Sequence, residues 1–77
     1  AYGKIIMEGK MEISARNVLP GTVKGIKLGQ VMAEVTVQVG RNEIVAAITK
    51  ASVERLGLKV GDKASVVIKA TSVMIAK

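Results

Sequence analysis

Ten consecutive residues, 30–39, alternate between small aliphatic and mostly polar side chains, and this pattern constrains the fold more than any other feature of the sequence. Successive side chains of a β-strand point to opposite faces, so a period of two indicates a strand with one buried face. The β-branched valines favour the same structure. The residues predicted to face the core are Val31, Ala33, Val35, Val37 and Val39.

The segments on either side of this strand predict an antiparallel meander. Residues 22–28 are also strand-like, and Gly25 interrupts their alternation, which predicts a bulge or a sharp bend. A short turn at residues 28–30 then connects the two strands as a hairpin. A second turn at residues 40–42 leads into a third predicted strand over residues 43–48.

The pattern changes after the third strand, where one short helix is predicted over Lys50–Leu56. Thr49 is a suitable N-cap, and Gly57 is a natural residue just past the helix C-terminus. Two further strands are predicted, over residues 64–70 and 73–76. Five or six strands and one short helix in a chain of 77 residues predict an all-β fold, a small Greek-key barrel like the oligonucleotide/oligosaccharide-binding (OB) fold.

The aliphatic content is too high for a single copy of the chain to bury in its own core. Hydrophobic residues make up 49% of the chain, and Tyr2 is the only aromatic one. A small domain has a large surface for its volume, so it cannot bury all of these side chains by itself. A core of this size also rarely contributes more than ~3–5 kcal/mol of stability. We therefore expect an obligate homo-oligomer.

No apolar run approaches the ~20 residues of a membrane-spanning helix, and residues 1–10 lack the hydrophobic core of a signal peptide. We therefore expect no membrane association and a cytoplasmic location. Residues 1–10 have no clean periodicity and are expected to be a leader, a tag or a linker, with an extra strand as the alternative. Residues 11–77 are expected to form the domain.

The chain has no cysteine and no histidine, which excludes disulfides and removes the commonest ligands of transition metals. It also shows no pair of a nucleophile and a base, so we expect a binding protein with no catalytic residues and not an enzyme. No side chain is expected to ligate a metal directly.

The net charge of +6 suggests nucleic acid, an anionic membrane or a small anion as the partner, and simple solubility would explain it equally well. A small barrel that binds single-stranded nucleic acid uses aromatic side chains to stack bases. This chain has no Phe or Trp, so nucleic acid is the weaker alternative.

Three short segments combine hydroxyls, small residues and cations. Each has an ordinary explanation alone: Thr49 caps a helix, Lys69 lies on a solvated strand face, and Arg16 lies beside a turn. Together Arg16 and Lys69 supply two positive charges, and Ser14, Thr49 and Ser52 supply neutral donors. A pocket with two positive charges suits a tetrahedral dianion that needs no acceptor, because an unpaired buried charge is very costly.

Residues 13–17, 21–23, 48–58 and 67–75 together resemble the Mop domain, the molybdate- and tungstate-binding module of the molbindins. The resemblance covers residues 11–77 in order. It implies an OB-like barrel that exchanges an N-terminal strand with a second copy, and a hexamer built as a trimer of dimers, with oxyanions held between subunits. It implies Ser14 and Arg16 from one subunit, Thr49, Ser52 and Lys69 from its neighbour, and backbone N–H groups near Ala15, Ala51 and Ala70.

The function implied by this resemblance is cytoplasmic binding of molybdate or tungstate for storage, homeostasis or sensing. Mop domains also form the C-terminal part of some transcription regulators and transporter ATPases, so a sensing domain of such a protein is the alternative. A nucleic-acid-binding β-barrel is the alternative from a different class.

Overall fold

The computed structural model describes residues 5–7, 11–13 and 16–77, and the chain divides into two compact units. The larger unit is Pro20–Ser65, and the smaller unit combines Ala1–Leu19 with Val66–Lys77. The elements of each unit are described separately below.

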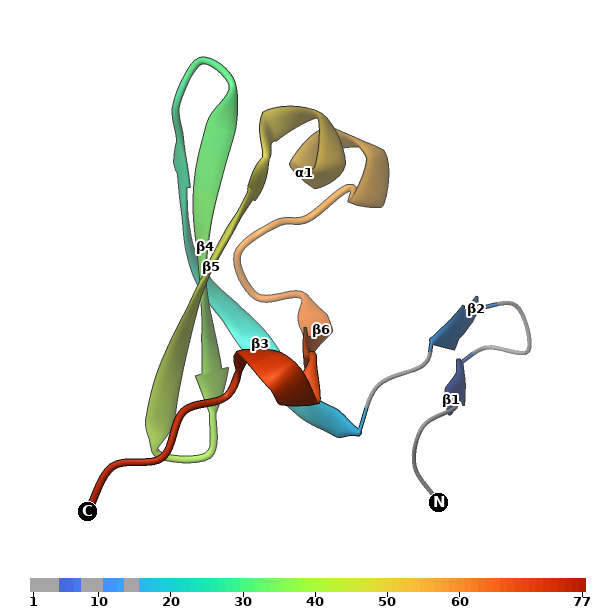
Figure 1. Cartoon of the computed structure of the whole chain (residues 1–77). Helices are drawn as coiled ribbons and strands as arrows, with labels where there is room; N and C mark the ends of the chain where they lie inside the picture. The colour runs from blue at the N-terminus through green and yellow to red at the C-terminus, as the bar shows by residue number, and fades with distance from the viewer. Residues whose placement is uncertain (1–4, 8–10, 14–15) are drawn as a thin grey trace. The chain divides into compact units, whose positions relative to one another are not determined.

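The larger unit is built on an antiparallel meander of strands β3 (Asn17–Leu28), β4 (Met32–Val39) and β5 (Asn42–Thr49) (Figure 1). The register of β3 against β4 shifts between Val23 and Gly25, which confirms the predicted bulge. Strand β6 (Lys63–Ile68) follows β3 in the sheet, giving the order β5-β4-β3-β6. This mostly antiparallel sheet with one short helix confirms the predicted all-β, OB-like fold class.

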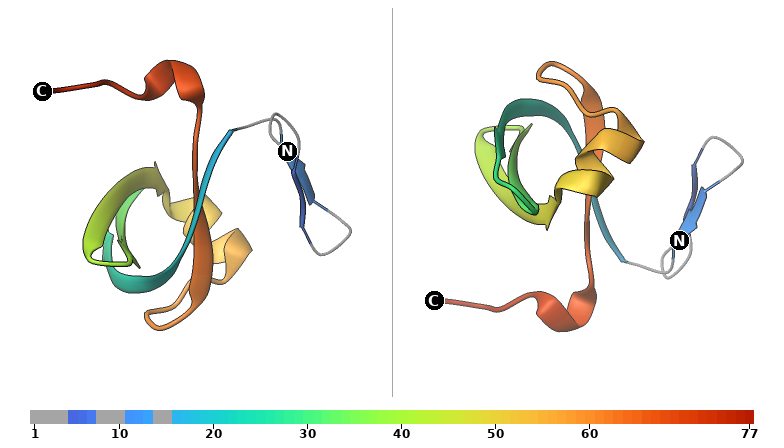
Figure 2. Two further views of the ribbon diagram at one scale, coloured as in Figure 1. Left: turned by 90° about the horizontal axis from the view of Figure 1, so that it is seen from below. Right: turned by 90° about the horizontal axis from the view of Figure 1, so that it is seen from above.

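Helix α1 (Lys50–Leu56) has the predicted limits and both predicted caps. Thr49 is extended at the N-terminus. Gly57 adopts a left-handed conformation with φ of 63°, and its N–H is donated to the last turn of the helix. Glycine tolerates this conformation because it has no Cβ to clash with the backbone. The helix packs against β4 and β5, and Figure 2 shows it on the open side of the curved sheet.

The core of the larger unit consists of small aliphatic side chains. Those buried are Val23 of β3, Ala33, Val35 and Val37 of β4, and Val53 of α1. The alternation of β4 therefore predicted its buried face.

The prediction that Val31 faces this core was wrong, because its side chain is 70% exposed. β4 begins one residue later, at Met32, and the chain before it is a tight turn closed by the bond from Gly29 N–H to the Met32 carbonyl, 2.8 Å. A side chain in that turn does not follow the alternation of side chains in the strand.

The smaller unit contains a hairpin of β1 (Ile5–Met7) and β2 (Met11–Ile13), paired antiparallel with Ile6 opposite Glu12. Residues 5–7 thus form a strand, which was the alternative interpretation of residues 1–10. The same unit contains the end of β6 and the 3₁₀ turn η1 (Ala70–Ser72).

The strand predicted over residues 73–76 is absent from the structure, and the preceding strand ends at Ile68 rather than at residue 70. The turn η1 redirects the chain after Lys69, with Ser72 N–H bonded to the Lys69 carbonyl at 2.8 Å. Met74 and Ile75 are 91% and 90% exposed. A strand needs a paired neighbour, and among the described residues none pairs with this segment.

Candidate functional site

Two hydroxyls form a hydrogen-bonded pair at the start of α1. Thr49 Oγ1 accepts the Ser52 backbone N–H at 3.0 Å, which caps the helix as predicted. The same Thr49 hydroxyl donates its proton to Ser52 Oγ at 2.8 Å. The cap residue therefore both orders the first turn and holds the second hydroxyl in place.

The Ser52 hydroxyl is left with a proton that it can donate. Ser52 Oγ accepts from Thr49 and also from Arg55 Nη2, at 3.4 Å. A hydroxyl has two lone pairs and one proton, so two accepted bonds leave that proton for a third group. The pair thus presents a donor and suits an acceptor-only ligand such as an oxyanion.

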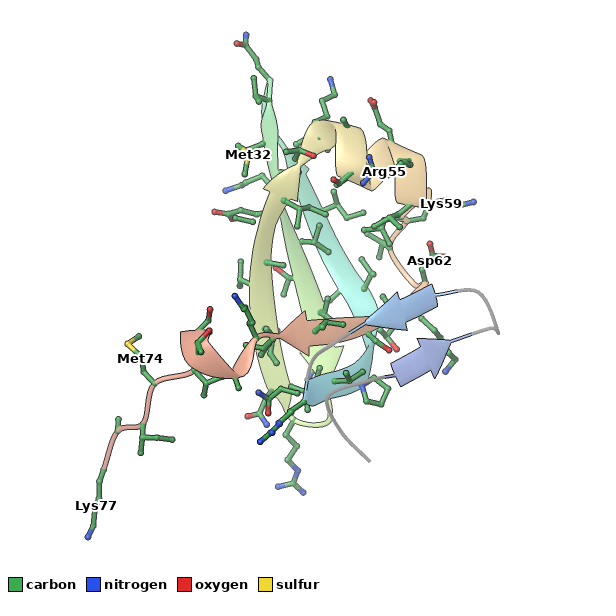
Figure 3. All side chains as sticks on the ribbon, turned by 45° about the vertical axis from the view of Figure 1, so that its right-hand side comes forward. Met32, Arg55, Lys59, Asp62, Met74 and Lys77 are labelled. Carbon is green, nitrogen blue, oxygen red and sulfur yellow. The ribbon has the colours of Figure 1, made fainter. Side chains whose placement is uncertain are left out.

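Arg55 is a residue that the sequence reasoning missed. Figure 3 labels it on α1, one turn after Ser52, and its guanidinium reaches back to the Ser52 hydroxyl. The signal was present in the sequence, since residues three apart on a helix are neighbours on one face. Arg55 adds a cation to the same helix face as Ser52.

A hollow of about 450 Å³ lies beside the start of α1. Thr49 and the small side chain of Ala51 line it, together with the cationic Lys50 and the anionic Glu54. Ser52 is not among the lining residues. The remaining lining residues, Gln30 and Val31, come from the turn before β4.

The other predicted site residues lie in the smaller unit. Arg16 is exposed in a bend directly before β3, and Lys69 is exposed between β6 and η1. Ala70 is the first residue of η1. Asn17, which follows Arg16, donates its Nδ2–H to the carbonyl of Ile68 at 3.2 Å. This bond joins the segment that carries Arg16 to the segment that carries Lys69.

The structure therefore groups the predicted site residues into two sets, one in each unit. Thr49, Ala51 and Ser52 are together at the start of α1, and Arg16, Lys69 and Ala70 are in the smaller unit. The predicted residues Ser14 and Ala15 lie outside the described residues.

Two classes of feature are absent from the described part of the chain. Residues 5–7, 11–13 and 16–77 contain no group of three or more His, Cys, Asp or Glu that could hold a metal ion. None of the helices in these ranges has the length and hydropathy of a membrane-crossing segment.

The chain resembles known proteins in both sequence and fold. Residues 13–75 match the model of the TOBE domain family. Molybdenum-pterin-binding protein 1 of Clostridium pasteurianum is 50% identical over 66 residues, covering 84% of this chain and 97% of that protein. Molybdenum transport protein ModE of Azotobacter vinelandii is 40% identical over 76 residues, covering 97% of this chain but only 28% of ModE.

Two solved structures are also similar. A molybdate-binding protein from Sporomusa ovata has a TM-score of 0.83 and 46% identity, covering 87% of this chain and 100% of that one. The cytoplasmic molybdate-binding protein ModG, solved with molybdate bound, has a TM-score of 0.75 and 47% identity, covering 87% of this chain and 48% of ModG. From the family match and these relatives, the chain belongs to the TOBE domain family and, within it, to the Mop domains.

Proposed function

We propose that this chain binds molybdate or tungstate in the cytoplasm, for storage, homeostasis or sensing of the oxyanion, and catalyses no reaction. The observation that carries the proposal is the hydroxyl pair of Thr49 and Ser52, which presents a donor at the start of α1. It occurs in a chain whose relatives include molybdate-binding proteins of 46% and 47% identity.

The chemistry of the predicted residues fits a fully deprotonated tetrahedral dianion. Arg16 and Lys69 supply two positive charges, which match the two negative charges of molybdate. Charge-assisted hydrogen bonds to such an anion contribute about 1.5–3 kcal/mol each. The predicted set contains no carboxylate that would repel the ligand. Backbone N–H groups near Ala15, Ala51 and Ala70 complete the proposed set of donors.

The proposed site lies between two copies of the chain, in a homo-oligomer built as a trimer of dimers that exchange a strand. Exposed aliphatic side chains support an oligomer, because water contact with large apolar surfaces is unfavourable. Among residues 16–77, the large apolar residues with more than half of their surface in solvent are Leu28, Val31, Val45, Leu56, Val60, Met74 and Ile75.

The domain is proposed to span residues 11–77. The alternative is a sensing domain of a larger protein. Under this alternative residues 1–10 are a linker rather than a leader or a tag.

Isothermal titration with molybdate, at moderate salt and with sulfate as the competitor, tests the proposal. We expect tight binding at fewer than one anion per subunit, with sulfate much weaker. The absence of heat with molybdate, tungstate and sulfate would contradict it. A steep salt dependence of DNA binding, unaffected by molybdate, would then favour a nucleic-acid-binding barrel.

A further inference from the structure

We propose that Asn17 is a positioning residue of the oxyanion sites, because its side chain fixes two segments of the same chain, one carrying the Arg16 that serves one site between subunits and one carrying the Lys69 that serves another. This inference rests on the proposed function, since it assigns a role within the same sites. It concerns a residue with no formal charge that need not touch the anion.

The contact that carries the inference is the bond from Asn17 Nδ2–H to the Ile68 carbonyl, 3.2 Å. It is half-buried and connects residues that are 51 positions apart in the chain. Arg16 immediately precedes Asn17, and Lys69 immediately follows Ile68. The bond thus joins the neighbours of the two cations in the smaller unit.

Both cations lie where regular structure ends. Arg16 is in a bend before β3, and Lys69 lies after the last residue of β6, with φ and ψ of −64° and 133°. The backbone there is not part of the regular strand ladder that orders the sheet. A side-chain bond that ties the two strand ends together limits the motion of the backbone from which both cations extend.

Position matters here because hydrogen bonds weaken steeply when their angles deteriorate, and a site needs its donors within about 0.5 Å of their productive positions. Removal of Asn17 leaves both positive charges on the protein. The long-range attraction for a dianion therefore remains, while the fixed geometry that distinguishes the larger molybdate from the smaller sulfate is lost. This pattern differs from the loss of a cation, which weakens the attraction itself.

The sequence offers a matched control. The dipeptide Arg-Asn occurs a second time as Arg41-Asn42, and Asn42, like Asn17, is the first residue of a strand. The Asn42 side chain is exposed and joins none of the side-chain hydrogen bonds described above. Asn42→Ala therefore removes the same group at an equivalent position, without the tether.

The experiment titrates the wild-type chain, Asn17→Ala and Asn42→Ala with molybdate, at two salt concentrations and with sulfate as the competitor. We expect Asn17→Ala to bind molybdate about tenfold more weakly, which corresponds to ~1.4 kcal/mol. Its preference for molybdate over sulfate should fall, and its salt dependence should match that of the wild type. Asn42→Ala should bind as the wild type does.

Wild-type affinity and selectivity in Asn17→Ala would overturn the inference, even if that variant melts at a lower temperature. An equal loss in Asn42→Ala would overturn it as well. If the wild-type chain itself binds no oxyanion, the proposed function fails and the role of Asn17 fails with it, a result distinct from both of these.

A second measurement needs no variant and covers the case in which Asn17→Ala does not fold. The side-chain amide resonances of Asn17 and Asn42 are followed by NMR as the wild-type chain is saturated with molybdate. We expect a clear shift for Asn17 and little change for Asn42. Equal, small shifts at full saturation would overturn the inference.

Discussion

Thr49→Val tests whether the hydroxyl pair at the start of α1 is formed as described. Valine has nearly the same shape as threonine, and it favours the extended conformation that Thr49 adopts, with φ of −74° and ψ of 150°. The substitution therefore removes one hydroxyl with little change in packing or backbone preference. It removes the bond from Ser52 N–H and the bond to Ser52 Oγ together.

The expected loss of stability follows from these two bonds. Loss of an N-cap hydroxyl costs about 1 kcal/mol, within a range of about 0.5–2 kcal/mol. The bond between the two hydroxyls is solvent-exposed and adds only a few tenths of a kcal/mol, because water replaces it readily. A total of about 1–1.5 kcal/mol corresponds to a decrease in Tm of roughly 4–12 °C for a domain of this size.

Thermal unfolding followed by circular dichroism measures the effect, with all variants at one protein concentration because the Tm of an oligomer depends on concentration. Thr49→Ser is the control, since serine keeps both bonds and should melt within about 2 °C of the wild type. If Thr49→Val melts at the wild-type temperature, the cap bond does not stabilise the helix. A molybdate titration of the same variants should show weaker binding for Thr49→Val only.

Three further predictions concern the cations, the assembly and the sheet. Arg16→Ala and Lys69→Ala should each weaken molybdate binding by at least ~1.5–3 kcal/mol, the contribution of a charge-assisted hydrogen bond, and wild-type affinity in both by titration would refute the site. Dilution should not yield a stable folded monomer; a monomeric mass with native circular dichroism at nanomolar concentration would contradict this. Gly21→Ala should lower Tm far more than Gly25→Ala, because a Cβ at Gly21 would lie 2.5 Å from a backbone oxygen of β4, whereas the space around Gly25 is open. Equal values of Tm for the two glycine variants would refute the described close approach of β3 to β4 at Gly21.

Local signals in the sequence predicted α1 well, and the end of the chain poorly. The limits of α1 follow from Thr49 and Gly57, residues that act on the backbone within one turn of themselves. The strand expected over residues 73–76 has suitable composition, but strand formation also needs a neighbour to pair with. Which segment provides that neighbour is a long-range property that a local pattern does not contain.

The same distinction applies to the candidate site. Thr49 and Ser52 are three residues apart, so local geometry at the start of a helix is enough to bring their hydroxyls together. Arg16 and Lys69 were grouped by their chemistry, and the contact that connects their segments joins Asn17 to Ile68 across most of the chain. No local pattern marks Asn17 as the residue that makes this contact.

The few contacts that stabilise α1 determine how stable the Thr49–Ser52 pair at its start can be. The helix has seven residues, of which only Val53 is buried, and an isolated helix needs about 12–15 residues to be even marginally stable in water. Its order therefore depends on the burial of Val53, on its two caps and on the bond from Lys50 N–H to the Val31 carbonyl, 2.7 Å. Such an element opens at a lower free energy than the strands beneath it. An anion held by Thr49 and Ser52 would bind only when α1 is folded. Binding of the anion and folding of the helix would therefore be coupled, and the bound anion would stabilise α1.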